Sequence, residues 1–317
     1  MKKIVSFMLC MVMVLSMAAC GSGSESTNLT FGTGGDQGTY YGYGSVLSQY
    51  VSDKTDVTVK AVTSKGSQAN IEDMAAGAIQ LGFVQSDVMS YAYSGTNLFT
   101  EKVEGFSTVA ALYMEQVQIV TLNPEIKSVA DLAGKTVSIG ATGSGVYFNA
   151  LDILGVYGLS EQDINPVYQA FGDSVESLQD GKIDAAFIVA GAPTTAVSSI
   201  AATNDVYLVS LDDAHIADLI ALSPYYSKNV IKADVYGTPE DCTTVAIGAV
   251  VIASDEVSED AVYAFVSTIF ENAKEITASH AKGGELDLAF ASSITDVPYH
   301  AGAAKYFAEK NIEVPTK

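Results

Sequence analysis

The chain has 317 residues, of which 48% are hydrophobic, and a formal net charge of -21 at pH 7. Such an acidic surface disfavours binding to nucleic acid and to anionic lipid. All 16 basic residues are lysine, so an anion must be held by backbone N–H groups, hydroxyls, amides or lysine, without the guanidinium group that usually clamps a carboxylate.

The start of the chain predicts export and a lipid anchor. A basic pair precedes the apolar run 4–15, which is too short to span a membrane, and small residues then lead to Cys20. This pattern resembles a bacterial lipoprotein signal, although Met17 stands where leucine is usual. It predicts a signal peptide over residues 1–19, lipidation of Cys20 and a flexible lipid-anchored linker over residues 20–27. The expected location is extracytoplasmic, on the periplasmic side or the cell surface, with the protein attached to the cell membrane by its lipid.

The next part of the chain alternates short apolar segments with helical patterns. The predicted strands cover residues 29–33, 57–62 and 81–84. Helices are predicted to begin near Thr39, Ser67 and Ser86. This alternation is typical of parallel β-α-β units.

A long extended stretch, residues 108–121, could carry the chain out of this first lobe. A second set of elements begins with the segment 129–137 and continues with predicted helices over 145–157 and 194–202 and predicted strands over 185–189 and 206–211. The apolar run 245–253 suits a strand buried on both faces. After it, apolar residues recur at the spacing of a helix that packs on a sheet, namely Val262, Phe265, Val266, Ile269 and Phe270.

We interpret this tail as a return to the first lobe. Two crossings between lobes predict a hinged α/β clamshell. Lobe 1 is predicted to contain residues 28–117 and 248–317, and lobe 2 residues 118–247.

Four polar loops each follow a predicted strand and open a predicted helix, at residues 34–39, 64–68, 85–87 and 142–145. In open α/β sheets the carboxyl ends of the strands face the ligand crevice, and helix N-termini there present free N–H groups. A simpler interpretation is that Ser67 and Ser86 are N-caps and that the glycines permit tight turns.

Enzyme chemistry finds no support in the residue spacing. The sequence has no HExxH or GxSxG motif, and His215, His280 and His300 lie far apart. Glycines 32, 34 and 38 follow a strand, but no acidic residue at the end of the second strand is placed to bind a ribose. We therefore predict no catalytic residue, no metal ligand and no cofactor.

Six segments in chain order carry a family resemblance: GTGGDQGTYYGYG, AVTSKGSQAN, LGFVQSDVMSYAYSGT, SVADLAGKTVSIGATGSG, GKIDAAFIVAGAPT and PYHAGAAKYFAEK. Over almost the whole mature chain they resemble the TAXI family of TRAP transporter solute receptors. FVQSD and TGSG are the more specific parts, whereas DLAGKTV is shared by many bilobed binding proteins. Ala301 stands where the family's closing His-Pro-Gly element often has proline.

The resemblance implies a type II periplasmic-binding-protein fold, with two α/β lobes joined by hinge strands. It implies a monomer that captures a small organic solute and delivers it to TRAP membrane permease subunits, driven by ions without ATP. Family ligands include glutamate-like amino acids and dicarboxylates.

The predicted solute contacts lie in the loops between strands and helices and on tyrosines that could wall the cleft. They are Gly35, Thr39, Tyr40, Ser67, Gln85, Ser86, Asp87, Tyr113, Thr142, Gly143, Ser144, Gly145, Gly191 and Tyr225. Among these, Asp87 could bind a ligand ammonium or cap its own helix, and Ser144 and Gly191 would be contributed by lobe 2 on closure.

Two other functions share parts of this pattern. A ligand-sensing lipoprotein that signals to a membrane receptor would have the same fold. A secreted hydrolase is a more distant alternative, which turnover would distinguish.

Overall fold

The computed structural model describes residues 27–317. The predicted signal peptide, Cys20 and all but the last residue of the predicted linker lie outside the described residues. Within residues 27–317 the strands form one mixed ten-stranded sheet with the main order β2-β1-β3-β10-β4-β7-β5-β6, while β8 pairs with β4 and β9 with β10. No helix in this part of the chain has both the length and the apolar character required to cross a bilayer.

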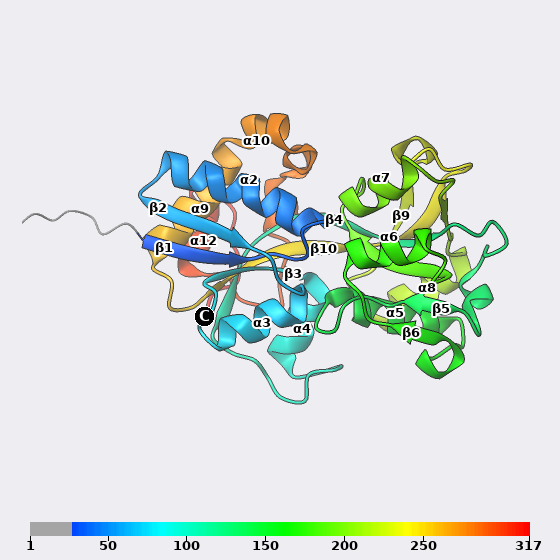
Figure 1. The fold of residues 1–317 in the computed structure, drawn as a ribbon. Helices are drawn as coiled ribbons and strands as arrows, with labels where there is room; N and C mark the ends of the chain where they lie inside the picture. Colours follow the sequence, from blue (N-terminus) through cyan, green and yellow to red (C-terminus); the bar gives the residue numbers. More distant parts are fainter. Residues whose placement is uncertain (1–26) are drawn as a thin grey trace, which may run out of the picture.

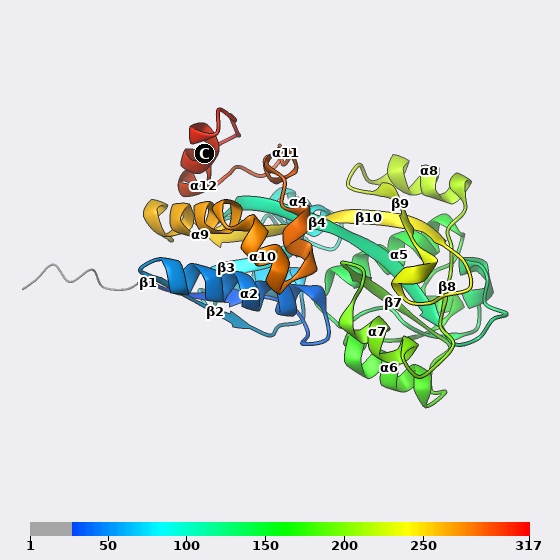
Figure 2. The same ribbon diagram turned by 90° about the horizontal axis from the view of Figure 1, so that it is seen from above.

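Two long antiparallel strands join the halves of the molecule. They are β4 (Phe106–Thr121) and β10 (Cys242–Ser254), which pair over most of their length. Figures 1 and 2 show them running side by side from one lobe into the other. The predicted extended stretch 108–121 and the predicted strand 245–253 both fall within them. The lobe boundaries at 117/118 and 247/248 stay a prediction, and we use "lobe 1" and "lobe 2" in that sense.

Lobe 1 is built on three parallel strands, β1 (Thr27–Gly32), β2 (Val57–Val62) and β3 (Leu81–Gln85). Each is followed by a helix: α2 (Thr39–Lys54), α3 (Ser67–Ala75) and α4 (Ser86–Ser94). In Figure 1, α2 lies above the strands, and α3 and α4 lie below them. The C-terminal part of the chain adds α9 (Glu259–Glu271), α10 (Ala273–Ser279), the 3-10 helix η4 (Ala281–Glu285), α11 (Leu288–Ala291) and α12 (Ala301–Glu309).

Lobe 2 repeats this layered plan. Its strands are β5 (Thr136–Ser138), β6 (Asn165–Val167), β7 (Ala185–Ala190), β8 (Tyr207–Leu208) and β9 (Ser227–Ile231). Its helices are α5 (Gly145–Val156), α6 (Phe171–Gln179), α7 (Thr195–Ala201) and α8 (Asp213–Leu222). Short 3-10 helices cover Val129–Leu132, Glu161–Asp163 and Ala233–Val235. Helices α6 and α7 pack together on one side of the sheet, and α5 and α8 on the other (Figure 2).

An aromatic stack supports the inner end of lobe 1. The rings of Tyr40 and Phe83 are stacked with centroids 4.7 Å apart, and the rings of Phe83 and Phe31 with centroids 4.9 Å apart. Phe265 of α9 meets Phe31 edge to face at 5.8 Å. Each such pair contributes about 0.5–1.5 kcal/mol beyond the burial of its area. The stack therefore fixes the start of α2 against β3, next to the space between the lobes.

The prediction of an α/β protein with two lobes joined by hinge strands is confirmed. Four elements of lobe 2, namely β6, β9, α6 and α8, were not among the predicted segments. The predicted strand 206–211 is also much shorter than expected, because β8 covers only Tyr207–Leu208.

Candidate functional site

A cavity of about 110 Å³ lies between the two lobes. Lobe 1 contributes the loops after β1 and β2 and the end of β3, and lobe 2 contributes the loops after β5 and β6 and the end of β7. Strands β1, β2 and β3 are parallel to one another, as are β5, β6 and β7, so these are their carboxyl ends. The cavity thus occupies the crevice where α/β proteins bind ligands.

Half of the predicted solute contacts line this cavity. They are Gly35, Thr39, Tyr40, Ser67, Gln85, Ser144 and Gly145. These residues lie up to 110 positions apart in the chain and come from both lobes.

Five helices begin at the cavity wall without a side-chain cap. They are α2, α3, α4, α5 and α6, whose N-cap residues Gly38, Gly66, Gln85, Ser144 and Ala170 all line the cavity. In contrast, α8, α9, α11 and α12 have N-caps whose side chains accept a bond from the first turn. A helix N-terminus without a cap retains N–H donors and a partial positive charge, which suit an anion.

The serines of these loops do not act as caps. Ser67 and Ser86 are the first residues of α3 and α4, and the Ser67 hydroxyl accepts a bond from the Gln85 N–H at 3.0 Å. Ser144 is the N-cap of α5, yet its hydroxyl is buried without a partner. The side-chain carbonyl oxygens of Gln85 and Gln169 are likewise buried without a partner. Because buried polar atoms are nearly always bonded, these three atoms of the cavity wall suit polar groups of a solute.

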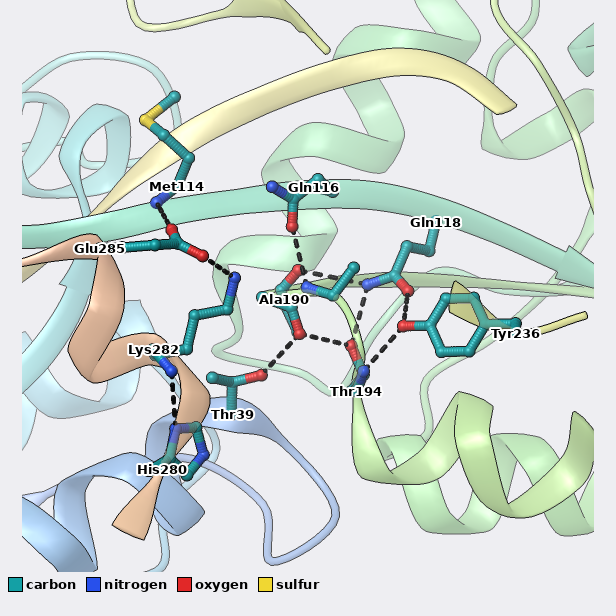
Figure 3. A network of polar contacts seen from close by, with 12 residues as sticks. Thr39, Met114, Gln116, Gln118, Ala190, Thr194, Tyr236, His280, Lys282 and Glu285 are labelled. Atoms are coloured by element: carbon teal, nitrogen blue, oxygen red, sulfur yellow. Dashed lines mark hydrogen bonds and ion pairs between the residues drawn. The ribbon is translucent and has the colours of Figure 1, made fainter. Parts of the chain in front are cut away.

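Hydrogen bonds between the lobes surround the cavity. The Thr39 hydroxyl donates to the Gly191 carbonyl at 3.0 Å, and the Ala69 N–H donates to the Gly143 carbonyl at 3.0 Å. The Ala196 N–H also donates to the Gln37 carbonyl at 3.1 Å. Figure 3 shows Thr39 reaching across to the chain beside Ala190 and Thr194. The structure therefore describes the lobes in contact, with the cavity between them.

Two glycines permit this approach. A Cβ atom at Gly145 would lie 1.9 Å from the Gln85 side-chain carbonyl oxygen and 2.9 Å from the Ser67 hydroxyl. A Cβ atom at Gly191 would lie 2.3 Å from Cε of Lys282. The lobes can therefore approach this closely only because residues 145 and 191 are glycines.

The other half of the predicted contacts lies outside the cavity wall. Thr142 and Gly143 line an outer groove beside α3, and Gly191 takes part in the contact between the lobes. Ser86 and Tyr225 line a groove that also includes Met114. Since Met114 and the cavity residue Glu115 are consecutive on β4, that groove lies on the opposite face of the sheet.

Tyr113 and Asp87 are also away from the cavity wall. Tyr113 is only 1% exposed and packs edge to face against Tyr43 and Phe83. Asp87 is fully buried, where its Oδ1 accepts from the Val88 N–H at 2.7 Å and its Oδ2 from Asn149 at 2.9 Å. Burial raises the pKa of the Asp87 carboxyl to about 7.

The bond between Asp87 and Asn149 joins α4 of lobe 1 to α5 of lobe 2. The Asn149 amide also donates to the Tyr226 hydroxyl at 3.1 Å, and that hydroxyl donates to Asp152 at 2.9 Å. Asp87 is therefore a contact between the lobes, and we restrict the proposed solute contacts to residues that line the cavity.

The sequence reasoning missed Glu115, Lys65 and the segment 169–171, all of which line the cavity. Glu115 is 2% exposed, and the Tyr40 hydroxyl donates to its Oε2 at 2.9 Å. Burial raises the pKa of Glu115 to about 8. A signal was available, because Glu115 is the single acidic residue of the long strand 106–121.

Comparisons with solved structures place this fold among solute-binding proteins. The alkanesulfonate-binding protein SsuA from Xanthomonas axonopodis pv. citri, bound to MOPS, aligns over 91% of this chain and 92% of its own at 15% identity, with a TM-score of 0.52. A protein assigned as an L-cystine ABC transporter from Listeria monocytogenes aligns over 82% of this chain and 98% of its own at 16% identity, also with a TM-score of 0.52. The predicted type II periplasmic-binding-protein fold is therefore confirmed. Residues 31–310 also match the model of one family along most of the chain, and the protein belongs to the NMT1-like family.

Proposed function

We propose that this protein is an extracytoplasmic solute receptor. It captures a small organic anion, a glutamate-like amino acid or a dicarboxylate, between its lobes and delivers it to the permease subunits of an ion-coupled TRAP transporter. The protein binds its solute without chemical turnover.

The observation that carries this proposal is the convergence of five uncapped helix N-termini on one cavity between the lobes. Helix N-termini at the wall of one cavity suit a carboxylate, and the chain has no arginine to bind it instead. The volume of about 110 Å³ favours a solute of few atoms, because pockets for drug-sized ligands measure about 300–1,000 Å³.

The type of transporter is a separate part of the proposal. The motif resemblance favours a TRAP permease, whereas one similar structure is an alkanesulfonate-binding protein and another is assigned as an L-cystine ABC transporter. Uptake into vesicles that contain the partner permease distinguishes a TRAP system from an ABC transporter, because a TRAP system requires an ion gradient and continues without ATP. Uptake that requires ATP hydrolysis would contradict the TRAP assignment.

The proposal also includes lipid anchoring through Cys20. In cells that export the full chain, the wild type is expected in the membrane fraction. Cys20→Ser removes the acylation site and should release the protein into the soluble extracytoplasmic fraction. Retention of Cys20→Ser on the membrane would argue against the anchor.

The solute class is tested by thermal shift of residues 27–317 with amino acids, dicarboxylates, sugars and polyamines, followed by calorimetry of each hit. A ligand at 100 times its dissociation constant stabilises the folded state by about 2.7 kcal/mol. We expect shifts with small carboxylates, and shifts with sugars or polyamines alone would contradict the proposal.

Gly145→Ala tests whether these ligands bind in the cavity. The added methyl group would collide with Gln85 and Ser67, so we expect affinity to fall at least tenfold. Gly155→Ala is the matched control, because Gly155 lies in the same helix and no atom lies within 4 Å of its added Cβ. Equal loss of affinity in both variants would contradict the assignment of the cavity.

A further inference from the structure

A buried carboxyl group, that of Glu115, forms part of the cavity wall. It is 2% exposed and accepts a hydrogen bond from the Tyr40 hydroxyl at 2.9 Å. Tyr40 is itself buried and stacked on Phe83, so the hydroxyl is held in place. The carboxyl is therefore a fixed feature of the cavity.

No cation of the described chain pairs with this carboxyl. Within residues 27–317, no lysine or histidine nitrogen lies within 4.0 Å of a Glu115 oxygen. The nearby Lys282 is already engaged, since its ammonium pairs with Glu285 at 2.5 Å and lies 5.4 Å from the centre of the Tyr113 ring (Figure 3 shows the ion pair).

A buried carboxylate without a counter-charge is costly, whereas one that receives a cation is stabilised. Elsewhere the cavity wall offers hydroxyls, Lys65 and helix N-termini, which complement negative charge. The small cavity therefore combines a carboxyl group that can bind a cation with hydrogen-bond donors that can bind an anion.

We propose that Glu115 binds a cationic amino group of the solute, which is a small zwitterion with an ammonium and at least one carboxylate. This inference rests on the proposed function and deepens it, because it selects amino acids over plain dicarboxylates. The carboxylate end lies against the uncapped helix starts, and the ammonium end lies against Glu115. Glu115 is thus the residue that sets specificity, the role that the sequence prediction considered for Asp87.

The proposal predicts that solute binding releases a proton from Glu115. Burial raises the pKa of Glu115 to about 8, Asp87 of α4 adds to this rise, and Tyr40 of α2, Gln85 of β3 and Lys282 of η4 oppose it. Tyr113, its other titratable neighbour on β4, stays neutral because burial raises its own pKa well above 10. In the empty cavity at pH 7, Glu115 is therefore mostly protonated. A bound ammonium lowers the pKa of Glu115 and releases close to one proton, whereas a dicarboxylate leaves the proton in place.

Calorimetry with matched probes tests this. L-glutamate is compared with glutarate, and L-aspartate with succinate, at pH 7 in two buffers of different ionisation enthalpy. The wild type is expected to bind the amino member of a pair at least tenfold more tightly and to release nearly one proton. Glu115→Gln retains an acceptor for Tyr40 but removes the charge, so it should lose most of this preference and all of the proton release. The exposed substitution Glu72→Gln on α3 should change neither.

Three results would overturn the inference. Equal or tighter binding of glutarate or succinate by the wild type would leave the proposed carboxylate receptor intact but refute the role of Glu115. An unchanged preference in Glu115→Gln would do the same. Failure of all four probes to bind the wild type would refute this inference together with the proposed carboxylate class. Proton release is measured on the wild type alone, so the inference can be tested even if Glu115→Gln folds poorly.

Discussion

Asp87 and Glu115 link the stability of the protein to pH, because both are buried carboxyls with raised pKa values. A carboxyl whose pKa is higher in the folded than in the unfolded state binds more protons when folded. The stability that this extra proton binding gives the folded state is fully present below the pKa of the unfolded state. It is lost as the pH rises through the pKa of the folded state. The free energy of unfolding should therefore fall between about pH 4 and pH 8.

Replacing Asp87 should flatten this dependence. Between pH 5 and pH 7 the Asp87 carboxyl is expected to cost about 2–3 kcal/mol of stability, at about 1.4 kcal/mol per pH unit. Asp87→Asn cannot ionise, and Asn149 can turn its unpartnered carbonyl oxygen toward it. Urea titrations of residues 27–317 without ligand at pH 5, 6, 7 and 8 measure the effect.

The exposed residue Asp53 on α2 provides the control through Asp53→Asn. This variant should keep the pH dependence of the wild type. A steep decline with pH that persists in Asp87→Asn would assign the effect to other groups, with Glu115 the next to test.

Single residues show where sequence reasoning was limited. Ser67, Gln85 and Ser144 could be placed at the cavity because they follow strands, and strand ends are readable from apolar runs. Glu115 could not, because it lies inside a strand, and the face on which a strand residue lies depends on what packs against each side. For Asp87 two roles stayed open, a ligand contact and a contact with its own helix, because one helical position decides between facing the cavity and facing α5.

At the level of elements, the predicted starts of α2, α3, α4 and α5 coincide with the observed ones and that of α7 lies within one residue, whereas α6 and α8 were missed. The missed helix α6 follows Ala170, an N-cap residue that gives no sequence signal, and the missed strand β6 is too short to show an alternating pattern. At the cavity the N-cap side chains accept no bond from the helix starts, although the Ala69 and Val88 N–H groups are bonded elsewhere. The rule that locates helix starts is thus least informative at the proposed binding site.

Helix α3 is tied to two strands by one buried side chain. The Asn70 amide donates to the carbonyls of Gly32 and Thr33 at the end of β1 at 3.2 and 2.7 Å, and to the carbonyl of Phe83 in β3 at 2.7 Å. Asn70→Ala leaves these acceptors short of a donor and should destabilise the protein by about 2–4 kcal/mol. Chemical denaturation measures the loss.

The same helix offers a matched control in Gln68→Ala. Gln68 bonds only to Glu72 on the solvent side, so its removal should change stability by less than about 0.5 kcal/mol. Similar losses in the two variants would mean that Asn70 does not act as the link between α3 and the strands.

For the whole molecule, binding is expected to shift an equilibrium between open and closed lobes. Asn149 contributes to the closed state from outside the cavity, through its bond to Asp87. Asn149→Ala should therefore weaken solute affinity about tenfold, since one buried bond to a carboxyl contributes about 1.5–3 kcal/mol. Small-angle scattering should show a larger radius of gyration for this variant at subsaturating solute.

Asn165→Ala, an exposed substitution within lobe 2, is the control for this experiment. It should match the wild type in affinity and in radius. A loss of stability in Asn149→Ala without any change in affinity would show that the bond supports the fold and does not favour closure.

The two-lobed topology was predictable because the extended stretch 108–121 leads out of the first set of elements and the tail after the run 245–253 was interpreted as a return to it. The distance between the lobes was not predictable from the sequence. It depends on contacts such as that of Gly145 with Gln85, two residues separated by 60 positions in the chain.

The uncapped helix starts also affect how this protein can diverge. An N–H group belongs to every residue except proline, so substitutions along these loops change the walls of the cavity while its anion-binding donors persist. Preference among carboxylates can therefore drift during evolution without loss of affinity for carboxylates as a class. Sequence comparison of side chains would overlook this shared anchor, and only a proline or an insertion at a helix start would remove it.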